Sequence, residues 1–320
     1  MFSFLAAIAF LSSDPGPTAH FEAFSQALEE RGLECCWASP NTPLPEGTSH
    51  LVTDLSARSL ATLTQSPPAE NIRVFAYYDN PEEDLPGDYL ETAGKVIAFA
   101  ERVLFANQNL AGRSLFPKRD FGIGYSPLPE KAAALPANAD RSAFLSRHQV
   151  KERGQKLAFY FGGATQTHRL YALPHFLHLL SEAREELSDY TFVVQIHPRS
   201  TQDRSTVEKW KEQKGVYLPE LIISEASFEE AVAIADHALY YQTSASPLFL
   251  LSGIPTIQVG QWPRKDLLVD QGFCKGTVTS AEFIEGLSQE ELPLNREALL
   301  EELGICNNWR ENLYNSLLEK

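Results

Sequence analysis

The chain has 320 residues, of which 43 % are hydrophobic and 22 % are charged, and its formal net charge is −15. This length allows two domains, and this composition is typical of a soluble globular protein. A strongly acidic surface disfavours binding to nucleic acid or to anionic membranes through bulk charge, so we expect neither as a partner.

The four cysteines, Cys35, Cys36, Cys274 and Cys306, show no zinc-binding spacing, and we expect thiols in a reducing compartment. The opening run MFSFLAAIAFLSS has no Lys or Arg before its apolar part and is too short to span a bilayer. We therefore interpret Phe2 to Leu11 as a buried first strand. No later segment reaches about 18 consecutive apolar residues. Together these features predict a cytoplasmic protein without a transmembrane segment.

Strand-like and helix-like patterns alternate through the first part of the chain, which is typical of βαβ units and a parallel sheet. The predicted strands are Phe2–Leu11, Leu33–Ala38, His50–Thr53, Ile72–Tyr77 and Arg102–Ala106, and the clearest helices are Ala19–Arg31 and Ser56–Thr64. A proline-containing stretch follows from about residue 117. It predicts a connection between domains with one helix, Ser142–Arg153.

A second alternating block begins at Lys156 and predicts a second parallel sheet. Its strands are Lys156–Phe161, Thr191–Ile196, Leu221–Ser224, His237–Tyr241 and Pro255–Val259, with helices at Arg169–Leu187, Thr206–Gln213, Phe228–Ala235 and Pro247–Leu251 and three more after residue 279. We expect an α/β fold of two Rossmann-like domains, 1–150 and 151–320, with a cleft between them. The last helix is expected to pack back on the first domain. Such sheets bind ligands in the loops after their strands.

The first candidate loop is GGAT, Gly162 to Thr165, between a strand and a helix. Gly162 and Gly163 would let the backbone approach a ligand closely, and a helix start favours a phosphate. Such turns also occur without any ligand. The loop is not a P-loop, because no Gly-Lys-Ser/Thr sequence follows.

The second candidate is His197, at the end of the apolar run FVVQI. Pro198 has no N–H to continue a ladder, so the strand ends there and His197 lies at its carboxyl end. An imidazole at this place can donate a hydrogen bond to a phosphate, or it can be satisfied by a backbone carbonyl. Arg199 adds a local positive charge.

The third candidate is the stretch QTSASP, in which Thr243, Ser244 and Ser246 lie between a strand and a short helix. Hydroxyl and free N–H groups at a helix start can bind an anion. One Ser is enough for an N-cap, so three hydroxyls within four residues favour a ligand.

The second half resembles the donor-binding domain of GT-B glycosyltransferases and their relatives. The resemblance lies in YFGGAT, in VVQIHP and in EEAVAIADHALYYQTSASPLFLLSGIPTIQVG, and covers about 100 residues. The His-Pro pair and the later paired hydroxyls are similar to motifs of bacterial sialyltransferases and of CDP-glycerol transferases. The resemblance implies that His197, Ser244 and Ser246 contact the phosphate or ribose of a nucleotide donor.

The first half resembles the acceptor domain of the same superfamily more loosely, in SSDPGPTAHFEAFSQALEERGLECCW. Many members carry a catalytic His in the first turn, where this chain has Pro17, and His20 follows about one helical turn later. Sialyltransferases use an acidic base, which makes Asp14 the other candidate, although their acidic-acidic-Gly signature is absent. The resemblance therefore implies Asp14 or His20 as the catalytic base.

The helix PLFLLSG has no acid, whereas many UDP-sugar enzymes place a ribose-binding Glu there. This departure favours a CMP- or CDP-linked donor, so cytidine nucleotides are expected to bind better than uridine nucleotides. UDP-sugar 2-epimerases share the fold, but their catalytic residues have no convincing match. His168, His175 and His178 lie on one predicted helix, and we expect them on its surface.

The function predicted from these features is glycosyl transfer from a nucleotide-activated sugar or alditol, CMP-, CDP- or UDP-linked, to a hydroxyl of a glycan or lipid-linked acceptor. The donor residues would be Gly162, Gly163, Thr165, His197, Thr243, Ser244 and Ser246. The reaction would need no cofactor and no metal. The alternatives are a non-catalytic nucleotide- or partner-binding protein and a UDP-sugar 2-epimerase-like enzyme.

Overall fold

The computed structural model describes residues 7–40, 42–80, 87–112, 118–135, 140–163, 166–197, 200–214, 219–241, 243–260, 266–289 and 294–319. The chain forms two compact units. Unit 1 is Met1–Pro127 with Asn295–Lys320, and unit 2 is Leu128–Leu294. The sequence suggested domains of 1–150 and 151–320. In the structure, helix α5 (Arg141–Arg147) lies in unit 2 and the C-terminal segment lies in unit 1.

Unit 1 is built on a parallel six-stranded sheet, sheet A, in the order β2-β1-β3-β4-β5-β6. This is the flavodoxin-like order, in which the chain changes direction between β1 and β3. The strands are β1 (Ala7–Leu11), β2 (Glu34–Trp37), β3 (Thr48–Thr53), β4 (Arg73–Tyr78), β5 (Arg102–Phe105) and β6 (Arg119–Gly122).

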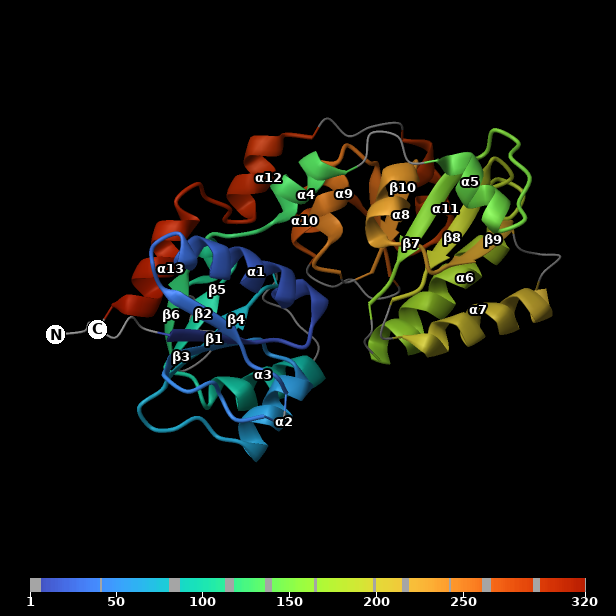
Figure 1. The fold of residues 1–320 in the computed structure, drawn as a ribbon. Helices are drawn as coiled ribbons and strands as arrows, with labels where there is room; N and C mark the ends of the chain where they lie inside the picture. The colour runs from blue at the N-terminus through green and yellow to red at the C-terminus, as the bar shows by residue number, and fades with distance from the viewer. Residues whose placement is uncertain are drawn as a thin grey trace. The chain divides into compact units, whose positions relative to one another are not determined.

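Helices cover both faces of sheet A (Figure 1). Helices α1 (Pro15–Glu29) and α13 (Trp309–Leu318) bury Phe21, Phe24 and Leu313 on one face. Helices α2 (Ala57–Gln65) and α3 (Gly87–Ile97) cover the other face. The remaining helices are η1 (Gln108–Leu110), a 3₁₀ turn, and α12 (Arg296–Glu302).

Two arginines fix the end of α13 to sheet A. Arg102 donates to the carbonyl of Ser316 at 3.0 Å, and Arg73 donates to the carbonyl of Leu317 at 3.1 Å. The last carbonyls of a helix have no partner within it and carry partial negative charge, so cations stabilise them. These bonds, with the apolar contacts to α1, explain why the C-terminal helix belongs to unit 1.

Unit 2 contains the second parallel sheet, sheet B, in the order β12-β11-β10-β7-β8-β9. Read from β7, this is the Rossmann order, with the change of direction between β7 and β10. The strands are β7 (Lys156–Phe161), β8 (Tyr190–Gln195), β9 (Glu220–Ser224), β10 (His237–Tyr240), β11 (Thr256–Val259) and β12 (Lys275–Thr277).

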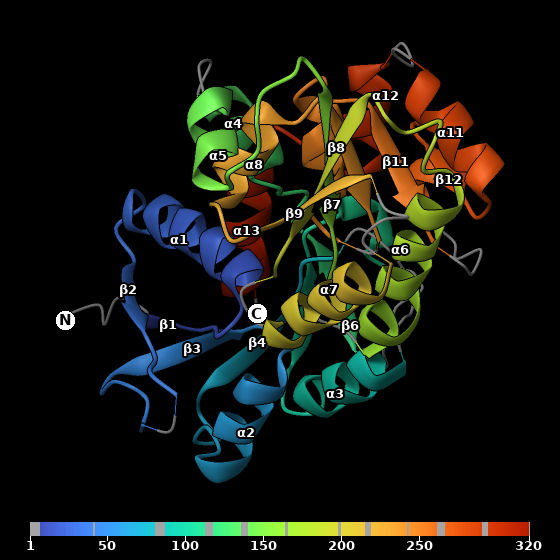
Figure 2. The same cartoon turned by 90° about the vertical axis from the view of Figure 1, so that its right-hand side faces the viewer.

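Sheet B is also covered on both faces, as Figure 2 shows for α6 and α7 on one side and α5 and α8 on the other. The helices of unit 2 are α4 (Leu128–Ala134), α5, η2 (His168–Ala172, a π-helical turn), α6 (Leu173–Glu182), α7 (Thr201–Lys214), α8 (Phe228–Ile234), α9 (Ser246–Leu251), α10 (Leu267–Asp270) and α11 (Ser280–Ser288). The two parallel sheets with flanking helices confirm the predicted α/β, GT-B-like fold class.

Candidate functional site

The three predicted donor turns of unit 2 follow neighbouring strands. In the sheet, Phe161 pairs with Gln195 on one side and with Tyr240 on the other. The turns after β7, β8 and β10 therefore leave the same carboxyl edge side by side. The turns after β7 and β10 flank the change of direction, which is where open α/β sheets bind ligands. This arrangement brings together the described residues Gly162, Gly163, His197, Thr243 and Ser244.

In the turn after β7, Gly162 leaves room for a side chain of its own domain. A Cβ at this position would overlap the imidazole of His168. Gly162 therefore admits the His168 ring, and the approach of a ligand to the backbone of the two glycines stays a prediction. Gly163 follows directly, and Thr165 lies outside the described residues.

His168 is a buried residue, with an exposed fraction of 2 %, so its expected place on a helix surface is wrong. The helix here has a π-helical turn, in which the N–H of Leu173 bonds to the carbonyl of His168 five residues back. Pro174 follows and has no N–H for the regular helical bond. Such turns are frequent at functional sites.

His197 lies two residues beyond β8 and is half-buried. Strand β8 is buried on both faces, as expected for a central parallel strand. The N–H of Ser200 donates to the His197 carbonyl at 2.8 Å, which holds the turn before α7. Pro198 and Arg199 lie outside the described residues.

The hydroxyls after β10 have different environments. Thr243 Oγ1 accepts a hydrogen bond from the N–H of Ala245 at 3.3 Å, so this hydroxyl caps the turn. Ser246 begins α9 and is buried. Ser244 is exposed and is the hydroxyl of the three that solvent or a ligand reaches most easily.

Beneath this edge lies a group of buried polar side chains, which we call the buried polar cluster: Tyr160, His168, Asp203 and Tyr241. The Tyr160 ring stacks on the His168 ring, with 5.8 Å between the ring centroids. His168 Nδ1 lies 3.6 Å from Asp203 Oδ2. Burial raises the pKa of Tyr160 well above its usual value and also raises the pKa of Asp203. Among the described residues, neither Tyr160 Oη nor Asp203 Oδ1 has a hydrogen-bond partner, which is unusual for buried polar atoms.

In unit 1, the carboxyl edge of sheet A is acidic. Asp14 precedes α1, Asp54 follows β3 and Asp79 follows β4. Burial raises the pKa of Tyr89, and the charges of Asp79, Asp14 and Asp54 are among the further causes. These three carboxylates therefore lie within electrostatic reach of one phenol.

Asp54 is fully buried and organises this edge. Its Oδ2 accepts from the hydroxyl of Ser12 at 2.8 Å and from the N–H groups of Ser13 and Asp14 at 2.9 and 3.2 Å. Its Oδ1 accepts from the N–H and hydroxyl of Ser56 and from the hydroxyl of Ser59. Asp54 belongs to none of the motifs from which the site was predicted. It fixes the turn that carries Asp14.

His20, the other predicted base, lies on α1 with its Nδ1 hydrogen-bonded to the Tyr77 hydroxyl. Burial raises the pKa of Tyr77 well above its usual value, so the phenol is protonated. This bond holds the His20 ring against Tyr77. Asp14 and His20 both stay candidates for the catalytic base.

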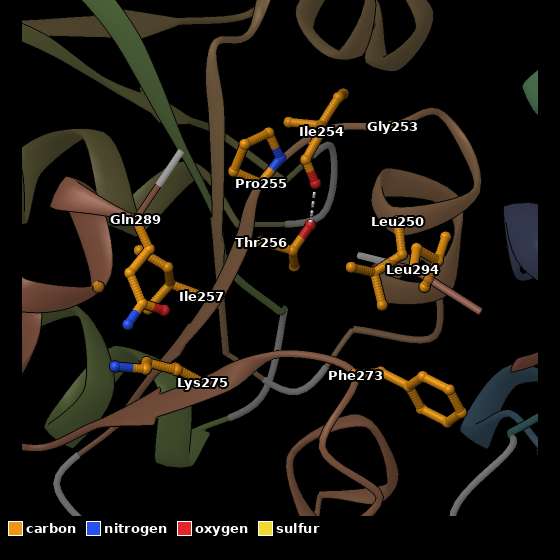
Figure 3. Close-up of a pocket in the computed structure, with 11 residues that line it drawn as sticks. Leu250, Gly253, Ile254, Pro255, Thr256, Ile257, Phe273, Lys275, Gln289 and Leu294 are labelled. Carbon is orange, nitrogen blue, oxygen red and sulfur yellow. Dashed lines mark hydrogen bonds between the residues drawn. The ribbon is translucent and has the colours of Figure 1, made fainter. Parts of the chain in front are cut away.

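A separate pocket of about 240 Å³ lies at the amino ends of β11 and β12, at the opposite edge of sheet B from the three turns. Figure 3 shows the side chains of Lys275 and Gln289 at one side of it. Lys275 already forms an ion pair with Glu285 at 2.6 Å. The remaining lining is mostly apolar, so this pocket is not the predicted phosphate site.

Within the described residues, no group of three or more His, Cys, Asp or Glu side chains is arranged to hold a metal ion. The same part of the chain contains no helix that is both long and apolar enough to cross a bilayer.

The two sheets, their helices and the strand-end turns define an α/β protein of the GT-B-like fold class. No known family model matches the chain, and no curated protein matches it. Solved structures do. A UDP-N-acetylglucosamine 2-epimerase from Rickettsia bellii has 11 % identity and a TM-score of 0.69, over 98 % of this chain and 96 % of that chain.

A UDP-GlcNAc 2-epimerase from Methanocaldococcus jannaschii, in complex with UDP-GlcNAc and UDP, has 12 % identity and a TM-score of 0.67, over 98 % of this chain and all of that one (100 %). WaaG, a glycosyltransferase involved in lipopolysaccharide biosynthesis, has 16 % identity and a TM-score of 0.54. This match covers 98 % of this chain and 100 % of that chain. At these identities the similarity establishes the fold alone.

Proposed function

We propose that this chain binds a nucleotide-activated sugar and that the carboxyl edge of sheet B holds the phosphates. The observation that carries the proposal is the convergence of three turns at the change of direction of the sheet. Gly162 and Gly163 lie on one side of it and Ser244 on the other, with His197 after the next strand. Backbone N–H groups, a hydroxyl and an imidazole are donors suited to phosphate oxygens.

The proposed reaction is glycosyl transfer to a hydroxyl acceptor. The bond from the anomeric carbon to the phosphate oxygen breaks, a bond to the acceptor oxygen forms, and the acceptor proton passes to a base. His197 and the turn donors would stabilise the leaving phosphate. The candidates for the base are those that the resemblance implies, Asp14 and His20, both in unit 1.

The second candidate is a UDP-sugar 2-epimerase-like reaction. It is favoured by the higher TM-scores of the two epimerases, 0.69 and 0.67, against 0.54 for the glycosyltransferase. Proton NMR of the protein with UDP-GlcNAc in D₂O separates the two reactions. An epimerase exchanges the proton at C2 and produces a second set of sugar signals without any acceptor, whereas a transferase leaves C2 unchanged.

Calorimetric titration with UDP, UMP, CDP and CMP, with ADP as the control, tests donor binding itself. The missing acid in α9 favours cytidine nucleotides, whereas the complex of a similar structure with UDP favours uridine nucleotides. The titration therefore ranks the affinities for the two nucleobases. Absence of binding for all four pyrimidine nucleotides would favour the non-catalytic alternative.

His197→Ala is the variant that tests the site. We expect it to weaken binding of the best nucleotide by about 1 to 3 kcal/mol, the range for hydrogen bonds to charged groups, with little change in the ligand-free melting temperature. His178→Ala is the control, because His178 is exposed and pairs with Glu182. A His197→Ala protein that melts early yet binds normally would assign His197 to stability alone.

A further inference from the structure

Two turns of the candidate donor site are connected by a continuous path of contacts. The path begins at Gly162, on whose backbone the His168 ring lies. The ring faces Asp203, with Nδ1 and Oδ2 3.6 Å apart. The N–H of Asp203 donates to the Ser200 carbonyl at 3.3 Å, and the N–H of Ser200 donates to the His197 carbonyl at 2.8 Å.

A second contact runs parallel to the first. Arg169, next to His168, donates to the side chain of Gln202, next to Asp203. The η2 turn is therefore attached to the start of α7 by an exposed pair and by a buried pair. His168 and Asp203 are both nearly fully buried, with exposed side-chain fractions of 2 % and 3 %.

The electrostatics agree with this geometry. Burial, together with the charges of His197 and Arg169, lowers the pKa of His168 to about 4. At neutral pH the imidazole is uncharged, so its contact with Asp203 is that of a dipole with a carboxylate. At 3.6 Å this contact is longer than a direct hydrogen bond and sensitive to small displacements.

We propose that His168 is a positioning residue, which fixes the turn at Gly162 relative to the turn at His197 through Asp203. This role rests on the proposed function, because its purpose would be to hold the donors of both turns in one geometry for a phosphate. Preorganised donors bind an anion more tightly than donors that must be ordered on binding.

His168→Phe tests the role, because it keeps a ring on Gly162 and removes the nitrogen that faces Asp203. Asp203→Asn changes the same contact from the other side with little change of shape. His178→Phe is the matched control on the same helix, since His178 is exposed and bonded to Glu182. All variants are first compared by thermal unfolding.

The ligand-free readout is amide hydrogen exchange by NMR. The Ser200 amide should exchange about tenfold faster in His168→Phe and in Asp203→Asn than in the wild type. The Gly253 amide, which bonds to Leu250 elsewhere in unit 2, should be unchanged. A Ser200 exchange rate within twofold of the wild type in both variants overturns the proposal, whatever the nucleotide result.

The second readout is the dissociation constant for UDP and CDP. His168→Phe and Asp203→Asn should each raise it about tenfold, and the double variant should raise it no further, because both changes break one contact. Wild-type binding that survives in both variants, or an additive double variant, overturns the positioning role. A wild type that binds neither nucleotide instead contradicts the proposed function, and the exchange experiment then decides on His168 alone.

Discussion

The carboxyl edges of the two sheets treat their polar groups in opposite ways. In unit 1, both oxygens of Asp54 are saturated by side chains and N–H groups of the neighbouring turns. In unit 2, buried Tyr160 Oη and Asp203 Oδ1 have no hydrogen-bond partner among the described residues. Because an unsatisfied buried polar atom costs about 1 to 3 kcal/mol, the second edge retains such atoms at the expense of stability.

This difference separates a supporting role from a binding role. A saturated carboxylate such as Asp54 cannot accept further donors without losing existing ones, so it acts as a scaffold. An edge with unsatisfied buried atoms close to a glycine turn is the kind of place where natural proteins depart from ideal packing for function. Variants at the two edges and the pH dependence of stability test this contrast.

The largest effect is expected for Asp54→Ala. The change removes the acceptor of the N–H groups of Ser13 and Ser56 and of the buried Ser59 hydroxyl, so we expect unfolding of unit 1 to become easier by about 3 kcal/mol or more. Urea denaturation followed by circular dichroism measures this change in the free energy of unfolding. Glu91→Ala, which removes an exposed i,i+4 pair with Lys95, is the control and should leave the stability of unit 1 almost unchanged.

The second prediction concerns acid sensitivity. Burial lowers the pKa values of His168 and His237, both in unit 2, to about 4. In the unfolded chain these groups titrate near 6.5, so the unfolded state binds more protons between pH 6.5 and pH 4. Stability should therefore fall as the pH falls through this window, by up to about 1.4 kcal/mol per pH unit for each group.

Urea denaturation at pH 7, 6 and 5 measures this slope, and His168→Phe should flatten it where His178→Phe does not. The raised pKa of Asp203 acts in the opposite sense at the acid end of the window, because protonation of this buried carboxyl favours the folded state. An unchanged slope in His168→Phe would mean that His168 is protonated in the folded protein.

Much of this fold could be predicted from the sequence, because it depends on local patterns. The apolar run Lys156–Phe161 is β7 as predicted, and the predicted strand Thr191–Ile196 differs from β8 by one residue at each end. Alternation of such runs with helices is enough to indicate two parallel sheets. The turns at Gly162, His197 and Ser244 could be found for the same reason, since each directly follows a strand.

The buried polar cluster could not be found in this way. His168 is buried by contacts with Gly162 and Asp203, which are 6 and 35 residues away in the sequence and meet only in the folded unit. One local signal was available. His168 precedes Ala172 by four residues and Phe176 by eight, and both lie on the buried side of the helix. The hydrogen bond of His20 likewise needs Tyr77, which lies on a strand distant in sequence.

Gly162→Ala tests the contact that the sequence could not reveal. The new methyl group overlaps the His168 ring, so we expect a loss of about 1 to 3 kcal/mol, as for overpacked cores. Gly94→Ala is the control, because nothing lies near its Cβ and alanine favours a helix by about 1 kcal/mol. The double variant Gly162→Ala/His168→Ala should lose less than the sum of the single variants. Strict additivity, measured by denaturation, would show that the ring and the glycine do not contact each other.

The smallest effect is expected at the turn after β10, where exposure separates two serines of the same predicted motif. Ser244→Ala removes an exposed hydroxyl, so stability should stay within about 0.5 kcal/mol while nucleotide binding weakens by about 0.5 to 1.5 kcal/mol, the net value of one hydrogen bond. Ser246→Ala, at a buried position, should show the reverse: a small loss of stability and unchanged binding. Calorimetry and thermal unfolding of the two variants provide both values. If Ser246→Ala weakens binding and Ser244→Ala does not, the phosphate is held by the buried start of α9 and not by the exposed turn. That result would contradict the binding role assigned to the exposed turn after β10.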